Sequence, residues 1–397
     1  MLNSKSIAQF EKRIQLDLIF AEPGDTIKIE PGSYDILGAL SIVGKKNIVL
    51  KGSGINSTVL NFKNQLDGAQ GLSISKCQNI TLEDFSIKDA KGNAIKCQYT
   101  DGIIFRRIKT LWQRGQGDVN VSHGIFALHC HNVLVEYCVT VSATDAGIHI
   151  EQSENIIVRF SEVYNNVTGI DIENSSSVDI YGNNVHKNAA GILIYSLPDL
   201  KVKESMLVRI FDNIIKENNS DNFSSDRSTT GNFLSGTGIL LMATEFVEVF
   251  HNTIVDNKTI GTAVVSYFIT GEKTKDTQYN PYTSSIYIHD NIYRRKSQVP
   301  ALDNKIGLLL FWHFFKIIPE IIYDGIPDPR YVGRDGTTPD SRRLCIVDNV
   351  NAKYLNLDLS KNFESWYYPF IADYGIDDGE CNCFQNRLPK VELSLIR

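Results

Sequence analysis

A strand-opening pattern, glycine followed by apolar-x-apolar, returns about every 22 residues through the middle of this chain. The openings are GLSIS at Gly71, GNAIK at Gly92, GIFAL at Gly124, GIHIE at Gly147, GIDIE at Gly169, GILIY at Gly191, GILLM at Gly238 and GTAVV at Gly261. A fixed period of this length is typical of repeat proteins, in which each unit packs on its sequence neighbours. The repeat constrains the fold more than the chain length does.

Each repeat contains a second strand after its opening, such as NIIVRF or SVDIYG. A leucine-rich repeat is the alternative solenoid, but it requires a leucine and asparagine consensus and one helix in each unit. We therefore predict an all-β fold, a single-stranded right-handed parallel β-helix with an N-terminal helical cap and an irregular C-terminal cap.

The two ends of the chain depart from the repeat. Ile7, Phe10, Ile14 and Leu18 form one stripe of a helix over 1–22, which we expect to cap an open end of the solenoid. The β-helix is predicted over 23–295. Beyond it the period is lost, and 296–397 is predicted to be a C-terminal capping region, although its apolar run could instead begin a small separate domain.

Alternation within each opening predicts which way its side chains point. The first and third residues after each glycine are mostly isoleucine or leucine, so they are expected to point inward and to stack from coil to coil. Asn79, Asn132 and Asn155 recur eight residues after their glycines, where a stack of amides can hydrogen-bond between coils. We interpret this stack as structural.

Composition and charge exclude several classes of protein. The formal net charge of −6 gives no basic surface for nucleic acid, so no nucleic-acid partner is expected. The most apolar run, from Ile306 to Ile318, is too short and too polar to span a bilayer, and no signal-peptide pattern opens the sequence. The C-x-C at Cys381 and Cys383 favours a structural role or a disulfide over a metal site.

The outward positions of the first strand column, read in the same way, form a polar stripe. Its central coils carry Lys96, His129, His149, Glu151, Gln152, Asp171, Glu173, Asn174, Tyr195 and Ser196. The corresponding positions of the flanking coils are small or apolar, so the charge is concentrated in the middle of the repeat.

Two insertions break the period, and both fall in the turn that leads into this same column. The first, around Leu111 to Ser122, brings Trp112 and Arg114, and the second is a polar stretch over about 218–237. Long loops on a rigid scaffold are frequent binding sites. The four coils between them would form a trough of roughly 20 Å, which fits an extended chain.

These positions suggest specific roles on an acidic polysaccharide. His129, His149 and Tyr195 are candidate acids or bases, and Glu151, Asp171 and Glu173 are candidate acid/base partners or Ca²⁺ ligands. Lys96 and Arg114 would contact carboxylates, with Gln152 and Asn174 as further substrate-binding candidates. Trp112 would either stack on a sugar or hold its own loop. The alternative for the stripe is an ordinary solvated strand face. Asp145, just before its strand, is predicted to be a turn residue rather than an acid catalyst.

At these residues the sequence resembles a bacterial family of right-handed parallel β-helix repeat proteins of unassigned activity. The resemblance is carried by AEPGDTIKIEPGSY at Ala21, NVLVEYCVTV at Asn132, TDAGIHIEQSENIIVRF at Thr144 and VTGIDIENSSSVDIYGNNV at Val167. The family favours Tyr and Gly where this chain has His149 and Glu151. More distantly, the coils resemble those of mannuronan C-5 epimerases and pectate lyases, although the Asp-Pro-His motif of the epimerases is absent.

The resemblance implies a periplasmic or cell-surface location for the full-length form. Together with the stripe, it favours a monomer that binds, and as an enzyme would modify, an acidic polysaccharide as a lyase, C-5 epimerase or glycoside hydrolase. The alternative is a non-catalytic surface rod, an adhesin-type scaffold that docks a partner protein.

Overall fold

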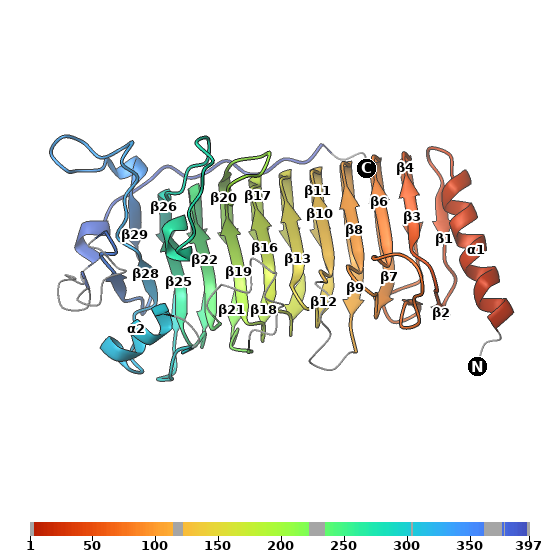
Figure 1. The fold of residues 1–397 in the computed structure, drawn as a ribbon, viewed down its shortest axis with the longest axis horizontal. Helices are drawn as coiled ribbons and strands as arrows, with labels where there is room; N and C mark the ends of the chain where they lie inside the picture. Colours follow the sequence, from red (N-terminus) through yellow and green to blue (C-terminus); the bar gives the residue numbers. More distant parts are fainter. Residues whose placement is uncertain are drawn as a thin grey trace. The chain divides into compact units, whose positions relative to one another are not determined.

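The computed structural model describes residues 4–113, 122–221, 235–302, 305–360, 375–376 and 378–394. Contacts divide the chain into two compact units. The first contains the described residues 4–171 and 391–394, and the second contains the described residues 172–390. Figure 1 shows that parallel strands of successive coils lie side by side within each unit.

In the first unit, the strands that begin the repeats pair in parallel to form the first strand column. They are β3 (Leu40–Val43), β6 (Leu72–Ser75), β8 (Ile95–Gln98), β10 (Ile125–Leu128), β13 (Ala146–Glu151) and β16 (Thr168–Glu173), which reaches into the second unit. The inward residues Leu72, Ile74, Ile148 and Ile150 are fully buried, as their alternation predicts. A Cβ on Gly71 would lie 2.8 Å from the Ala94 carbonyl oxygen of the next coil, so close packing between coils requires glycine there.

The remaining strands of the first unit form one sheet that consists of two parallel ladders joined by the long strands β7 and β9, and we call this sheet the second strand column. They are β1 (Thr26–Lys28), β2 (Gly32–Asp35), β4 (Lys46–Lys51), β5 (Thr58–Asn61), β7 (Gln78–Lys88), β9 (Asp101–Leu111), β11 (His131–Glu136), β12 (Val139–Val141), β14 (Glu154–Arg159) and β15 (Glu162–Tyr164). These strands pair in parallel, for example β9 with β11 and β11 with β14. The predicted parallel β-helix is therefore confirmed.

Helix α1 (Ser4–Phe20) covers the first coil, as the predicted cap would. Ile14 and Leu18 are buried. The Gln15 side chain donates to the Ser41 carbonyl at 3.0 Å and accepts from the Ser41 N–H at 2.9 Å, so it pairs with the exposed edge of β3 as a neighbouring strand would. Glu11 accepts the N–H groups of Leu37 and Gly38 in the same way.

The second unit continues both kinds of strand. Its first-column strands are β19 (Ala190–Tyr195), β22 (Thr237–Met242), β25 (Ile260–Val265), β28 (Ile321–Tyr323) and β30 (Tyr354–Asn356). Its second-column strands are β17 (Ser176–Tyr181), β18 (Asn184–His186), β20 (Ser205–Phe211), β21 (Ile214–Lys216), β23 (Thr244–Phe250), β24 (Thr253–Val255), β26 (Ser284–His289), β27 (Ile292–Arg294) and β29 (Leu344–Val347). The parallel pairing runs past the sequence-based boundary at residue 295, because β28, β29 and β30 each pair with the preceding coil.

The outer face of the first column in the second unit is covered. Helix α2 (Lys305–Phe314) and the segment around the 3₁₀ turn η2 (Tyr267–Thr270) pack on it. The cluster buries Leu193, Tyr195, Leu240, Met242, Ala263, Val265, Tyr267, Tyr279, Ile306, Leu310 and Ile322. The apolar run from Ile306 is thus part of this cover, and no helix among the described residues is long and apolar enough to cross a membrane.

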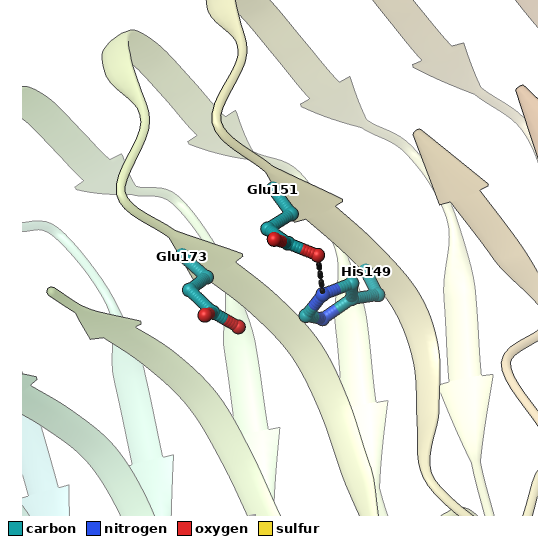
Figure 2. A group of neighbouring side chains, drawn as sticks. All are labelled: His149, Glu151 and Glu173. Carbon is teal, nitrogen blue, oxygen red and sulfur yellow. Dashed lines mark ion pairs between the residues drawn. The ribbon is translucent and has the colours of Figure 1, made fainter. Parts of the chain in front are cut away.

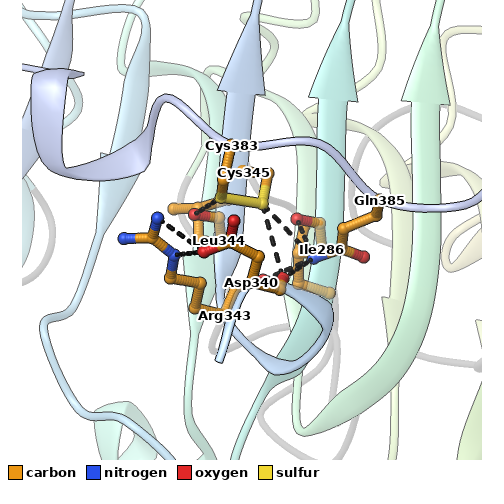
Figure 3. Close-up of a disulfide and its surroundings, with 7 residues drawn as sticks. All are labelled: Ile286, Asp340, Arg343, Leu344, Cys345, Cys383 and Gln385. Carbon is orange, nitrogen blue, oxygen red and sulfur yellow. Dashed lines mark hydrogen bonds and ion pairs between the residues drawn. A yellow bond between two sulfur atoms is a disulfide. The ribbon is translucent and has the colours of Figure 1, made fainter. Parts of the chain in front are cut away.

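A disulfide joins Cys345, on β29, to Cys383 (Figure 3). The C-x-C segment favours a structural role or a disulfide over a metal site, and Cys383 forms a disulfide with Cys345, whereas Cys381 does not take part. Gln385 then donates to the carbonyl oxygens of Arg343 at 2.7 Å and Asp340 at 3.0 Å, which holds residues 383–390 against the second unit as a C-terminal strap.

Asparagine stacks hydrogen-bond from coil to coil, but the longest ones lie outside the predicted positions. Of the predicted residues, Asn79, on β7, donates to Asn47 at 3.0 Å, whereas Asn132 donates to the Asp101 carboxylate at 2.8 Å. The longest stack runs through Asn183, Asn213, Asn252, Asn291 and Asn349, and each amide in it donates to the next at 2.9 to 3.0 Å. All of its members are buried except Asn349, which is half-buried. A second buried stack contains Asn188, Asn218 and Asn257.

Candidate functional site

The centre of the candidate site is His149, whose imidazole lies between two carboxylates of the first unit. His149 Nε2 is 3.7 Å from Glu151 Oε2, on the same strand, and Nδ1 is 3.4 Å from Asp171 Oδ2, one coil further on. Figure 2 shows the Glu151 carboxylate directed toward the imidazole. Both His149 and Asp171 are buried, with 5% and 0% of their surface exposed. The arrangement follows from alternation, because His149 and Glu151 are two residues apart on β13 and so share its outer face.

Glu151 is held in its ionised form. Burial raises the pKa of this carboxyl, but its contact with His149 and a hydrogen bond from Gln152 outweigh burial and leave the pKa below its ordinary value. Gln152 Nε2 donates to Glu151 Oε1 at 2.9 Å. The substrate-binding role predicted for Gln152 stays a prediction, and in the structure this amide orients the carboxylate.

His123 completes the site and was missed by the sequence analysis. Its ring stacks on that of His149, with centroids 4.6 Å apart and planes inclined by 14°. The Ala146 N–H donates to His123 Nδ1 at 3.3 Å, so the ring proton resides on Nε2. Burial lowers the pKa of His123 to about 4, which keeps the imidazole neutral at pH 7. His123 immediately precedes Gly124, so it lies outside the alternating positions of the strand. No periodic pattern in the sequence therefore predicts it.

Lys96 and Phe126 form the neighbouring part of the face. Lys96 pairs with Phe126, which pairs with His149, so all three occupy equivalent positions of successive coils. Counted from Gly92, the repeat predicts Lys96 two positions further along its strand. The difference arises because Gly92 is not the structural equivalent of the other opening glycines. The Lys96 ammonium lies 5.1 Å above the Phe126 ring, and Phe126 in turn contacts His149 at 4.8 Å between centroids.

The second unit holds three of the predicted residues in a different setting. Tyr195 Oη donates to Glu173 Oε2 at 3.0 Å, but Tyr195 is 1% exposed beneath the apolar cover. Asn174 donates to the carbonyl oxygens of Leu197 and Val202, which ties down a loop. The structure therefore does not support catalysis by Tyr195 or substrate contact by Asn174. The sequence predicts an open trough that includes the coil beginning at Gly191. This prediction is wrong for that coil, because its outer face is covered.

Four further predicted residues lie in the first insertion or in turns. Trp112 is 4% exposed and donates its indole N–H to the Ala90 carbonyl at 2.8 Å, so the structure supports its loop-holding role rather than sugar stacking. Arg114 lies outside the described residues. His129 follows β10 in a turn and stacks on Tyr99, with ring centroids 5.0 Å apart. Asp145 is buried in the turn before β13, where its N–H donates to the Ser122 carbonyl.

The predicted Ca²⁺ site fits the first unit poorly. Glu151 and Asp171 both face the His149 ring, so an imidazole nitrogen stands between the two carboxylates. Ca²⁺ prefers a shell of six to eight oxygens, whereas mixed nitrogen and carboxylate donors suit transition metals. Glu173, also labelled in Figure 2, lies on β16 beyond the boundary of the first unit. Its metal role stays a prediction.

Comparison with known proteins agrees with this architecture. Residues 117–271 match the family model described as "Right handed beta helix region". No curated protein matches the chain in sequence.

Among solved structures, the chain is similar to the A-modules of the mannuronan C-5 epimerases AlgE4 and AlgE6 of Azotobacter vinelandii. Both are 13% identical to it, with TM-scores of 0.55 and 0.54. The alignments cover 86% and 87% of this chain and 90% of each module. At this identity the likeness establishes the fold alone. By its sequence repeat and its coil architecture, the chain is a right-handed parallel β-helix protein.

Proposed function

We propose that the outer face of the first strand column in the first unit binds and chemically modifies an acidic polysaccharide, with His149 as the acid/base residue. One observation carries the proposal: a buried imidazole is held by a carboxylate at each of its two nitrogens, on a face that also carries a lysine. Two structurally similar modules are mannuronan epimerases, which supports a uronate polymer as the substrate class.

The geometry suits removal of a proton from the ring carbon that bears a uronate carboxylate. His149 would accept that proton at one nitrogen, and the carboxylates of Glu151 and Asp171 would stabilise the imidazolium that forms. If water returns a proton to the opposite ring face and His149 releases its proton to solvent, the result is epimerisation. If the glycosidic bond at the neighbouring carbon breaks instead and the departing oxygen takes up the proton from His149 or from water, the result is a lyase product with a new double bond. The Lys96 ammonium would bind the substrate carboxylate and stabilise its developing negative charge.

The test is a panel of alginate, pectate and related uronans, assayed with and without Ca²⁺. Absorbance of unsaturated products reports a lyase, NMR reports epimerisation, and reducing ends report hydrolysis. We expect turnover on at least one polymer and a loss of about 10²–10⁴-fold in kcat for His149→Asn. The matched control is His251→Asn, because the His251 side chain is 54% exposed and lies in the second unit.

A non-catalytic rod is the second candidate, and the burial of the site favours it. Asp171 is fully buried and His149 nearly so, as expected of a polar network that only stabilises the coils. Such a network predicts that His149→Asn lowers the melting temperature without any activity to lose. Absence of product from every polymer of the panel would therefore support the rod and contradict the enzyme.

A further inference from the structure

A second feature of the first unit is a row of side chains along one edge of the first strand column. Lys76, Tyr99, His129 and Gln152 each directly follow the last residue of a first-column strand, in β6, β8, β10 and β13. All four have positive φ, between 48° and 54°. The N–H groups of the first three donate to the carbonyl oxygens of Gln98, Leu128 and Glu151, one coil further on. Their side chains therefore project at the same place on four successive coils.

The row leads directly to the proposed acid/base residue. At its far end, Gln152 donates to Glu151, the carboxylate that faces His149. Three steps of coil spacing place Lys76 roughly 14 Å from Gln152 along the coils. A polymer that occupied the His149 face could extend along the row.

Beside the row lies a pocket of about 440 Å³, lined by two lysines, aromatic and imidazole rings and one carboxylate. Its walls include Lys46, Lys76, Tyr99, His129, His131 and Asp101, and the Asp101 carboxylate accepts a hydrogen bond from Asn132 at 2.8 Å. Within the described part of the chain, neither Lys46 nor Lys76 makes a side-chain ion pair or hydrogen bond, and both are exposed. The larger cavity, of about 750 Å³, offers less to an anion, because its Arg106 and Arg159 are both paired with Glu136.

Tyr99 gives the pocket an apolar platform. Its ring is 54% exposed and is fixed by stacking on His129. Aromatic rings fixed in this way bind the apolar face of a sugar at little entropic cost. Ammonium groups beside a ring match a sugar that carries a carboxylate.

From this arrangement we infer that Lys46, Lys76, Tyr99 and His129, which lie one to four coils away from His149, form a binding subsite for a uronate residue of the same polymer. The inference rests on the proposed function. It adds the direction in which the bound polysaccharide extends from His149, which is toward Lys76. It also changes the role of His129 from acid/base residue to substrate contact.

The test measures binding of hexamers of galacturonate and of mannuronate, with cellohexaose as the uncharged probe, by calorimetry at low and high salt. We expect the double variant Lys46→Glu, Lys76→Glu to weaken binding of the preferred uronate hexamer about tenfold, with a smaller salt dependence. Tyr99→Ala should weaken it as well. Lys63→Glu is the matched control, because Lys63 is an exposed lysine of the same unit that does not line the pocket.

The outcomes separate the two proposals. If the wild-type protein binds uronate hexamers and the double variant binds as the Lys63→Glu control does, the subsite is refuted and the His149 site stands. If the wild-type protein binds no uronate hexamer, both are refuted. Where turnover is measurable, a substrate subsite requires the double variant to raise KM while His149→Asn lowers kcat.

Discussion

His123 is a buried base, and this gives the protein a measurable sensitivity to acid. Its pKa in the folded chain is about 4, below the ordinary 6.5, because burial disfavours the charged imidazolium. The unfolded chain therefore binds a proton between about pH 6.5 and pH 4 that the folded chain does not. Over that window His123 lowers the free energy of unfolding by up to about 3 kcal/mol as the pH falls.

We expect His123→Asn to remove this part of the pH dependence. Asparagine places an oxygen near the position of Nδ1, so it can still accept the Ala146 N–H, but it does not titrate. Denaturant unfolding of both proteins at pH 7, 5.5 and 4.5 measures the effect. The variant should lose less stability than the wild type between pH 7 and pH 4.5. Parallel pH profiles would show that His123 is solvated and titrates normally.

The Glu151 carboxyl also makes the stability of the protein depend on pH. Its lowered pKa means that the folded chain favours the ionised form, so its stabilising contribution is present above the ordinary carboxyl pKa. That contribution is lost as the pH falls through the lower, folded-state value. Glu151→Gln should therefore cost stability at pH 7 and progressively less in acid. A constant cost at every pH would contradict the charged contact with His149.

At the scale of elements, the buried asparagine stack holds neighbouring coils together. Asn252 donates to the carbonyl oxygens of Ile210 and Phe250 and accepts from Asn213. Asn252→Ala would leave these buried groups without partners, at a cost of about 3 kcal/mol. Asn61→Ala is the control, because the half-buried Asn61 side chain bonds to Asp35 and to the exposed Lys63 N–H, groups that water can reach. We expect about 1 kcal/mol or less for it, measured by denaturant unfolding. Equal costs would mean that the stack is not a principal link between coils.

The strands were predictable because alternation and steric exclusion act locally. At Gly124, Gly191 and Gly238 a backbone carbonyl of the next coil leaves no room for a Cβ, so at these glycines the repeat reports the packing of coils directly. The exception is instructive. At GNAIK the glycine precedes the strand by three residues, and Ala94 occupies the position equivalent to Gly71 in the hydrogen-bond pattern. Alternation preserved the outward direction of Lys96 but not its place along the strand.

The candidate site was only partly predictable, because contacts from outside the repeat decide which positions stay accessible. His149, Glu151 and Asp171 follow from alternation within two openings. The loss of Tyr195 from the open face depends on Tyr279 and on Leu310 of α2, which come from irregular insertions far along the chain. No periodic signal relates those insertions to the coil that they cover. His123 depends in the same way on a turn rather than on a strand.

At the scale of the whole molecule, the two units use the outer face of the same strand column differently. In the first unit this face carries Lys96, His149 and Glu151, and in the second it is apolar and lies beneath α2. The polar face and the additional apolar core therefore lie on different stretches of coils. One stretch of coils is free to carry polar side chains, and another contributes an additional apolar core. Substitutions in the apolar cluster beneath α2 should therefore affect stability rather than binding.

The C-terminal strap, residues 383–390, provides the last prediction. The disulfide between Cys345 and Cys383 closes a separation of 38 residues, for which chain entropy gives a stabilisation of about 4 kcal/mol. Arg387 then lies 2.8 Å from the buried Glu248 and also contacts His289. Burial raises the pKa of Glu248, but the contacts with His289 and Arg387 outweigh it and leave the pKa below its ordinary value. Without the strap, this carboxylate would lose a charged partner.

We expect Cys383→Ser, or reduction of the wild type, to lower stability by about 4 kcal/mol and to make the strap sensitive to proteases. Cys381→Ser is the matched control, because that thiol is not part of a disulfide. Arg387→Ala, with the disulfide intact, should also destabilise the protein by leaving Glu248 short of a partner. Melting curves with and without reductant, together with mass spectrometry of proteolytic fragments, measure both effects. A reduced protein that melts like the oxidised one and keeps its strap uncut would show that the disulfide is not needed, because the contacts of Gln385 and Arg387 suffice.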